Sequence, residues 1–460
     1  MYKGETMNNT LNKDRSSLKS SLFFIIPSLM GIILFIFPIK FQGNITIPVA
    51  ILSNLLANIL QNWLTSIITL TVCISTLISI IAKIFKPNFI VKSEFLNNLF
   101  NVGPLWLLAR LIGTIFCVLT LFNLGPKAII SDITGSFVLN DLLTILFTIF
   151  FFAGLLLPLL LNFGLLEFFG TMLTKVMRPI FRLPGRSSID CITSWLGDGT
   201  LGVMLTSKQY EDGFYSKREA VVIGTTFSAV SITFSLIVID TVGLAHLFIP
   251  FYLTVSLSGV IAAVIIPRIY PLNKISDTYY NNQKGNADES VPDGYNSLSW
   301  GYKKALEKAS QNSDIKKFFI DGLKNVIDMW FSVLPVVMAM ATSALIIAEY
   351  TSVFQVLGTP FIPYLKLLGV PEAVAASQTL VVGFADMLLP SVLAANTITN
   401  EMTRFIIACT SVSQLIYMSE VGGVLLGSKI PVSFKQLVIL FIERTIIILP
   451  IIVIVANILF

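Results

Sequence analysis

The chain has 460 residues, of which 55% are hydrophobic and 12% are charged, and its formal net charge is +5. Soluble globular domains carry about 25% charged residues, so this composition excludes an ordinary water-soluble protein and predicts one that is embedded in a bilayer. The small positive excess lies mostly in expected loops, where it indicates orientation in the membrane and no nucleic-acid partner.

Residues 1–19 form a basic segment ahead of the first apolar run, which extends from Ser20 to Ile39. This arrangement resembles a secretory signal peptide, but the run is long and has no A-x-A-like cleavage site. We therefore expect a retained first helix and a cytoplasmic N-terminus.

About nine apolar runs are long enough to be transmembrane helices, because a crossing of the hydrocarbon core needs about 20 residues. The first three would form a scaffold over residues 20–137, and the short apolar segment 47–61 would lie in, or re-enter, the outer interface. The predicted spans are residues 20–41, 64–85, 104–124, 138–163, 220–239, 249–266, 329–348, 405–426 and 437–458.

Basic residues set the predicted orientation, because loops rich in Lys and Arg stay on the cytoplasmic side. They gather at Lys83, Lys86 and Lys92, and again at Lys175, Arg178, Arg182 and Arg186. We predict a multi-pass protein of the bacterial cytoplasmic (inner) membrane with its N-terminus inside. An odd number of spans places the C-terminus outside.

Residues 271–328 are polar and rich in Asn, Ser, Asp and Lys, so they cannot bury enough apolar area to form a core. We interpret them as a cytoplasmic linker between two halves. The stretch from Trp300 to Phe319 mixes lysines with large apolar residues, which is typical of an amphipathic helix on the anionic inner leaflet.

Two segments, near residues 184–216 and 370–400, are too polar for lipid and too apolar for free loops. Backbone that turns round at membrane depth is tolerated only where protein or a water-filled cavity satisfies its polar groups. Both segments are therefore predicted to be re-entrant hairpins that line such a cavity.

The hairpins sit in two units, 138–270 and 329–460, that share the order span, proline-containing loop, hairpin, span, short link, span. Three crossings per unit is an odd number, so the second unit must enter the membrane from the opposite face. The sequence therefore predicts an all-α polytopic membrane protein with about nine transmembrane helices and two re-entrant hairpins in an inverted repeat, which is typical of secondary transporters.

Carboxylates and polar groups in and after the hairpins are the candidate solute ligands, because an acid at bilayer depth costs about 2.5 to 3.5 kcal/mol on insertion scales and needs a reason to be there. The excess of acids, among which Asp240 also counts, favours a coupling cation, H⁺ or Na⁺, or a substrate with an amine. Alternatively, some acids cap short helices or lie in water at hairpin tips. The candidate residues are Ser187, Ser188, Asp190, Thr193, Asp198, Thr226, Ser228, Gln378, Thr379, Asp386, Ser413, Gln414 and Glu420.

Two arginines lie within apolar runs. Arg110 is the main candidate basic partner for the acids, and Arg444 is expected to pair locally with Glu443. The four cysteines have no metal-binding spacing, and the nucleotide-binding, metalloprotease and hydrolase signatures are absent. We therefore expect no cofactor, no metal site and no enzyme activity.

The segments PGRSSIDCITSWLGDGTLGVMLTSKQYEDGFYSKREAVVIGTTFS and GVPEAVAASQTLVVGFADMLLPSVLAANTITNEMTRFIIACTSVSQLIYMSEVGG resemble bacterial Gate-domain membrane proteins, also called nucleoside-recognition domain proteins. The YjiH-type members are most similar, and the concentrative nucleoside transporters are similar more distantly. The resemblance implies a carrier-like core in which polar residues of both hairpins and of the following helices surround a solute. The chain lacks the Gln-Thr-Glu hairpin signature of the nucleoside transporters, so the solute stays open.

The leading hypothesis is a cation-coupled secondary transporter of a small polar solute, amino-acid-like, an amine or nucleoside-like, that works by alternating access. The alternative is a non-transporting membrane scaffold or assembly protein similar to the spore-maturation Gate proteins. The expected partners are the solute and the lipid bilayer, and a homo-oligomer is compatible with the sequence.

Overall fold

The computed structural model describes residues 20–37, 39–41, 44–197, 199–227, 230, 232–283, 285–286, 290–312 and 314–460. In this part of the chain the secondary structure is helical, apart from a two-stranded ribbon of β1 (Ile39–Phe41) and β2 (Asn44–Thr46). The strands are antiparallel, with Ile39 opposite Thr46. The predicted basic segment 1–19 lies outside the described residues.

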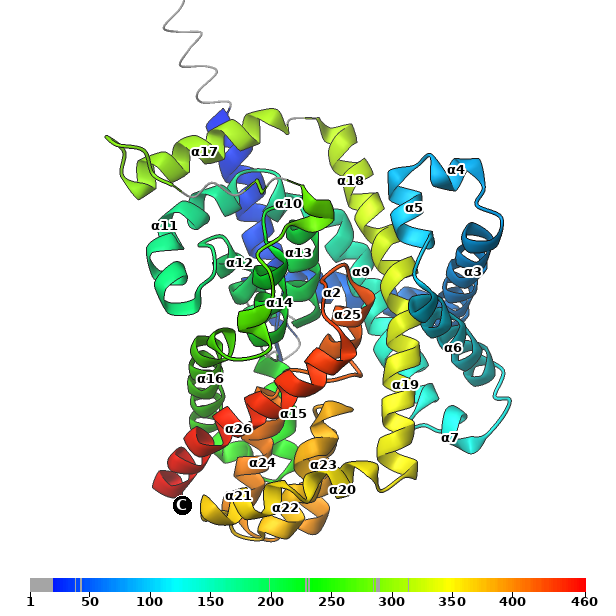
Figure 1. Ribbon diagram of the computed structural model, residues 1–460, viewed down its shortest axis with the longest axis vertical. Coiled ribbons are helices and arrows are strands. Elements are labelled where there is room, and N and C mark those ends of the chain that lie inside the picture. The colour runs from blue at the N-terminus through cyan, green and yellow to red at the C-terminus, as the bar shows by residue number, and fades with distance from the viewer. Residues whose placement is uncertain are drawn as a thin grey trace, which may run out of the picture.

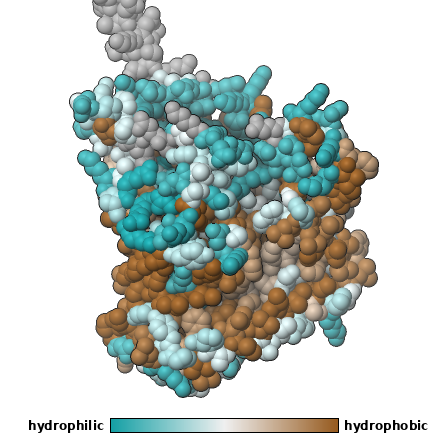
Figure 2. Space-filling model, viewed as in Figure 1, coloured by the Kyte–Doolittle hydropathy of each residue, from teal (hydrophilic) through white to brown (hydrophobic). Residues whose placement is uncertain are grey.

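Six helical segments in the described ranges are long and apolar enough to cross a membrane. They are Leu64–Ile84, Pro104–Leu121, Lys127–Leu161, Ala245–Lys274, Ile315–Tyr350 and Phe434–Leu459. Figure 2 shows a broad hydrophobic band across one face, with hydrophilic side chains gathered towards the end that carries α17 in Figure 1. The chain is therefore a polytopic membrane protein built from helices.

The N-terminal part consists of an apolar helix, Ser20–Phe35, followed by α2 (Pro48–Leu60), α3 (Leu64–Ile84), α4 (Asn88–Val91), α5 (Glu94–Phe100) and α6 (Pro104–Leu121). Arg110 on α6 is buried and donates to the Ser79 hydroxyl at 2.5 Å and to the Leu99 carbonyl at 3.0 Å. These hydrogen-bond partners belong to the N-terminal part and include none of the candidate acids.

The first hairpin-bearing segment follows two short helices, α7 (Lys127–Ile130) and α8 (Gly135–Phe137). It starts with a π-helical turn and an apolar helix, continues through several short helices and ends with a long one. Its elements are η1 (Val138–Leu142), α9 (Leu143–Leu156), α10 (Pro158–Leu161), α11 (Leu165–Phe181), α12 (Ser187–Ile192), η2 (Thr193–Gly197), α13 (Gly199–Glu211), α14 (Lys217–Thr226), α15 (Ile232–Thr241), η3 (Ala245–Leu247) and α16 (Phe248–Ile265). The first predicted hairpin is the pair α12 and α13.

The second hairpin-bearing segment again starts with a π-helical turn and a long apolar helix. Its elements are η7 (Met329–Val333), α19 (Leu334–Tyr350), α20 (Val353–Gly358), α21 (Phe361–Leu367), α22 (Ala373–Leu380), η8 (Val381–Phe384), α23 (Leu389–Thr397), α24 (Glu401–Ser413), α25 (Val421–Gly427) and α26 (Phe434–Leu459). The second predicted hairpin is the pair α22 and α23, which lies with α21 at the end of the molecule opposite α17 (Figure 1).

Two spans that the sequence predicted as continuous helices, 220–239 and 405–426, are interrupted. The first divides into α14 and α15, and the second into α24 and α25. Between α24 and α25 the backbone pairs with the second hairpin as well as with itself, because Met418 N–H donates to the Phe384 carbonyl at 2.8 Å and Ser419 N–H to the Ala385 carbonyl at 3.0 Å. Apolar composition predicted a helical segment at each place but carried no signal for this tertiary pairing.

The segment between the halves contains short turns and two helices, α17 (Ser297–Gln311) and α18 (Ile315–Asp328), so the single amphipathic helix predicted over 300–319 is divided. Helix α17 packs on α11 and lies beside the start of the Ser20–Phe35 helix, where Ser21 and Tyr302 hydroxyls are 2.9 Å apart. Helix α18 continues through η7 into α19.

The long helices of the two parts approach closely where side chains are small. A Cβ atom added to Gly113 on α6 would lie 2.0 Å from the Pro335 carbonyl oxygen on α19. Only glycine permits this contact, so the N-terminal helices are fixed directly against the first helix of the second hairpin-bearing segment.

Candidate functional site

A cavity of about 270 Å³ lies where the two hairpins and the two helix interruptions come together. We call it the acidic cavity. Its wall includes Thr200 at the start of α13, Asp386 before α23, and Val230 between α14 and α15. Tyr417 and Glu420, between α24 and α25, complete it. Four elements that are far apart in the sequence therefore share one small space.

The acidic cavity has an excess of negative charge. Asp141 on η1, Asp386 and Glu420 line it, and no Lys, Arg or His stands among its described lining residues. Asp141 is exposed, so this side of the cavity reaches the molecular surface. A group of carboxylates at bilayer depth favours binding of a cation or a protonated amine.

Asp386 has a structural as well as an electrostatic role. One carboxylate oxygen accepts from the backbone N–H of Leu388 at 2.8 Å at the start of α23, and the other accepts from the Ser419 hydroxyl at 2.8 Å. This is the helix-capping role that the sequence left open as an alternative. Asp386 also lines the cavity, so its role as a solute ligand stays a prediction beside this structural role.

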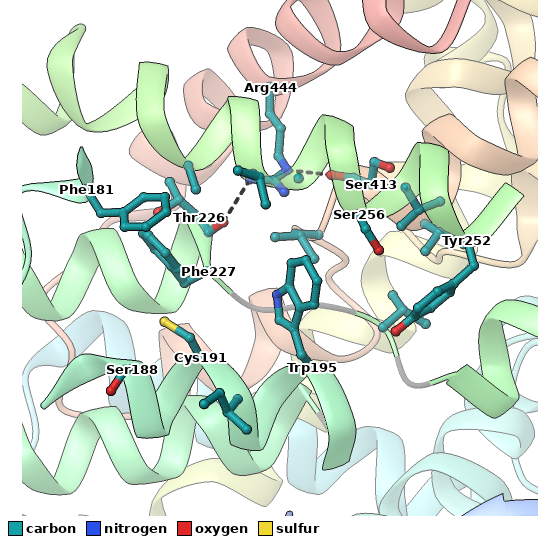
Figure 3. Close-up of a pocket in the computed structure, with 18 of the residues that line it drawn as sticks. Phe181, Ser188, Cys191, Trp195, Thr226, Phe227, Tyr252, Ser256, Ser413 and Arg444 are labelled. Atoms are coloured by element: carbon teal, nitrogen blue, oxygen red, sulfur yellow. Dashed lines mark hydrogen bonds between the residues drawn. The ribbon is translucent and has the colours of Figure 1, made fainter. Parts of the chain in front are cut away.

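A second cavity, of about 400 Å³, lies behind the first hairpin and is bounded by α11, α12, α16, α24 and α26. We call it the Arg444 cavity (Figure 3). Its walls are mostly apolar and include four aromatic side chains, Phe181, Trp195, Phe227 and Tyr252. Val230 and Leu415 line both cavities, so a thin apolar wall separates them.

Arg444 is fully buried and joins the ends of two interrupted helices. Its Nε donates to the Ser413 carbonyl at the end of α24, and its Nη1 donates to the Thr226 carbonyl at the end of α14, at 3.2 Å. The C-terminal end of a helix carries partial negative charge, which favours a guanidinium there. The expected local pair with Glu443 is wrong, since the ion pairs of the described residues include none with Arg444.

Three predicted solute ligands line the Arg444 cavity: Ser188, Thr226 and Ser413. The Ser188 hydroxyl is buried without a hydrogen-bond partner among the described residues, and the Ser413 hydroxyl lies 3.1 Å from that of Ser258 on α16. The structure thus divides the predicted ligands between two cavities.

Asp190 lines neither cavity. Its carboxylate accepts from the Thr206 hydroxyl and from Gln209 Nε2, both at 2.8 Å, and Arg186 Nε donates to Gln209 Oε1 at 2.6 Å. Arg186 in turn lies 3.5 Å from the Glu167 carboxylate on α11. These groups form a buried polar network that holds the first hairpin together and fixes it to α11.

The remaining candidates also have local partners or point elsewhere. Gln414 donates to the Leu380 carbonyl at 3.0 Å and to Thr445 Oγ1 at 2.9 Å, which ties α24 to the second hairpin and to α26. Ser187 and Thr379 bond to carbonyls of their own segments, Thr193 is buried, and Gln378 is exposed. Asp198 and Ser228 lie outside the described residues.

Sequence reasoning missed several lining residues, notably Asp141, Tyr417, Ser419 and Arg444. A charged residue inside an apolar run is costly, and this signal alone would have selected Asp141 and Arg444. No group of three His, Cys, Asp or Glu residues able to hold a metal ion occurs in the part of the chain that the structure describes.

Comparison with known proteins identifies the first hairpin-bearing segment. Residues 143–245 match the family described as Gate, nucleoside recognition. An uncharacterized protein of Alkalihalophilus pseudofirmus is 51% identical over 441 residues, which cover 96% of this chain and 95% of that protein. No solved structure matches. The chain therefore belongs to the same family as this Alkalihalophilus protein and contains a Gate nucleoside-recognition domain.

Proposed function

We propose that the protein is a cation-coupled secondary transporter that binds a small polar solute in the acidic cavity and moves it by alternating access. The observation that carries the proposal is the composition of that cavity. Both hairpins and both helix interruptions contribute to it, and three carboxylates, those of Asp141, Asp386 and Glu420, line it. A carrier needs such a site at the contact between two halves that can move.

The order of elements supports an inverted repeat with two re-entrant hairpins. Each half has a π-helical turn, a long helix, a hairpin of two short helices, an interrupted helix and a final long helix. The packing between halves is reciprocal, because α13 of the first hairpin packs against α25, and α23 of the second hairpin packs against α15. A two-fold relation between the halves predicts this exchange of partners.

The proposed arrangement has nine crossings. The six long segments, the Ser20–Phe35 helix and the two interrupted helices α14–α15 and α24–α25 would supply them. The proposed orientation has the N-terminus inside and the C-terminus outside the bacterial inner membrane. It agrees with Figure 1, where the C-terminus lies away from α17. In this proposal the cytoplasmic linker is the part of residues 271–328 that lies between the Ala245–Lys274 and Ile315–Tyr350 segments.

The solute class follows from the charge of the cavity. Carboxylates select a coupling H⁺ or Na⁺, an amine, or the amino group of an amino-acid-like solute, and hydroxyls such as Thr200 and Ser419 suit a nucleoside. The resemblance to YjiH-type Gate proteins and, distantly, to concentrative nucleoside transporters supports a carrier rather than an enzyme. A homo-oligomer is compatible with this function.

A ligand panel tests the function. We expect purified protein in lipid nanodiscs to gain thermal stability from at least one of a set of nucleosides, amino acids and diamines, and to gain more in Na⁺ or at low pH than in choline at neutral pH. A ligand at 100 times its Kd adds about 2.7 kcal/mol. Absence of any stabilisation, together with absence of uptake into proteoliposomes, would instead support the membrane scaffold.

Cysteine labelling tests the inverted repeat. In a background where the four native cysteines are alanine, Arg182→Cys beside the first hairpin and Glu401→Cys beside the second introduce exposed thiols. We expect an impermeant maleimide to label Glu401→Cys in intact cells and Arg182→Cys only in inverted vesicles. Labelling of both positions from one side would exclude the inverted arrangement of the hairpins.

A further inference from the structure

The Arg444 cavity has a chemistry that transport through the acidic cavity does not use. Its walls are apolar and aromatic, and Phe181 and Phe227 pack edge to face with ring centroids 4.8 Å apart. In Figure 3 the Trp195 ring stands in the cavity opposite the guanidinium of Arg444. At about 400 Å³ the space is within the range of about 300 to 1,000 Å³ that small-molecule sites occupy.

Arg444 is the single charged side chain among the described residues that line this cavity. It is 2% exposed, and among the described residues it donates hydrogen bonds to two backbone carbonyls, which are neutral. No carboxylate of the described chain lies within ion-pair distance of it. A buried guanidinium with only neutral partners is costly, and an anion in the cavity would supply the missing counter-charge.

A second group near the cavity also has unused hydrogen-bonding capacity. The Ser188 hydroxyl on α12 is 6% exposed and has no hydrogen-bond partner in the described structure, although it lines the cavity. A buried polar group without a partner costs about 1 to 3 kcal/mol, so a ligand with a hydrogen-bonding group would recover this loss.

The cavity opens towards the hydrocarbon region of the bilayer. Ile192 on α12 and Val260 on α16 both line it and are 39% and 41% exposed. The space therefore reaches the surface between α12 and α16. Arg444 is ten residues into α26, about 15 Å along that helix at 1.5 Å per residue, so it lies away from both ends of the helix.

We infer that the Arg444 cavity binds an apolar carboxylate that partitions into the bilayer, with the carboxylate on Arg444 and the tail between α12 and α16. The bound carboxylate supplies the counter-charge that Arg444 lacks. The aromatic walls contact the first carbons of the tail, and Ser188 offers a hydrogen bond. Cationic solutes are excluded from this cavity, in contrast to the acidic cavity.

Bromine quenching of tryptophan fluorescence tests this binding, because Trp195 lies in the cavity wall. We expect 9,10-dibromostearate to quench purified protein in nanodiscs with a midpoint at least tenfold lower than its methyl ester. The Trp195→Phe variant, which keeps the other four tryptophans, should lose this component. Arg444→Met should remove the preference for the acid over the ester, and Arg444→Lys should keep part of it.

A variant that fills the cavity but keeps Arg444 distinguishes a loss of acid binding from a loss of folding. A Cβ atom at Gly259 would be 3.9 Å from the Trp195 ring, so Gly259→Leu should fill the cavity and abolish the acid-specific quenching. Leu253→Phe adds bulk to the same helix on its exposed face, outside the cavity, and should not change it. Equal quenching by the acid, the ester and a brominated phospholipid would overturn the inference, because Trp195 would then only contact the surrounding lipid. Unchanged affinity of Gly259→Leu for the acid would overturn it as well.

Discussion

The Asp386→Asn variant is expected to keep the stability of the protein and to lose solute binding. Asparagine caps a helix nearly as well as aspartate, so the bond to the Leu388 N–H at the start of α23 is retained while the charge disappears. A hydrogen bond to a charged group contributes about 1.5 to 3 kcal/mol, which corresponds to a roughly 10- to 100-fold loss of affinity. Thermal unfolding with and without the stabilising solute of the panel measures both quantities.

The matched variant Asp386→Ala separates the cap from the charge. It should lose the same binding and, in addition, about 1 kcal/mol of stability, because α23 then has an unsatisfied N–H. Ser419→Ala removes one hydrogen bond to the carboxylate at 2.8 Å but leaves its charge, and should weaken binding less. If Asp386→Asn binds the solute like the wild type, the carboxylate is only a helix cap.

The Asp190→Ala variant is expected to show the opposite pattern, with a large loss of stability and intact solute binding. Its carboxylate accepts from Thr206 and Gln209 inside the protein and contacts neither cavity. Removal of one partner from a buried charged network costs about 3 to 5 kcal/mol. The thermal unfolding midpoint in detergent should fall by many degrees, while the affinity of the surviving folded protein for the panel solute stays unchanged.

Asp240→Ala is the control for this comparison, because Asp240 is an exposed acid on α15 and its removal should leave the unfolding midpoint nearly unchanged. The conservative variant Asp190→Asn should fall between wild type and alanine, since an amide can accept only one of the two bonds well. If folded Asp190→Asn loses as much solute affinity as Asp386→Asn, Asp190 is part of the binding site.

Much of the architecture could be predicted because it depends on composition and period. Apolar runs of sufficient length gave the membrane setting, and the polar segments near 184–216 and 370–400 correspond to pairs of short helices. The interruptions between α14 and α15 and between α24 and α25 could not be predicted. The second is held by backbone bonds between Met418 and Phe384, and such bonds leave no mark on side-chain polarity.

Only some of the residues that line the two cavities could be predicted from the sequence, for a related reason. Acidic residues in apolar runs are recognisable, and Asp386 and Glu420 do line the acidic cavity. Whether a buried acid faces a cavity or its own hairpin depends on side-chain direction, which distinguishes Asp386 from Asp190 only in three dimensions. Arg444 was assigned a neighbour in sequence, whereas its partners Thr226 and Ser413 come from two other helices.

The backbone pairing between the second hairpin and the interruption of its following helix has a mechanical consequence. Two hydrogen bonds, from Met418 and Ser419 to Phe384 and Ala385, make this hairpin tip and the chain that carries Glu420 one rigid body. Asp386 and Glu420 must therefore move together. Opening the acidic cavity then requires either the wall with Asp141 and Thr200 to slide past this body, or the loss of both bonds at about 1 kcal/mol each.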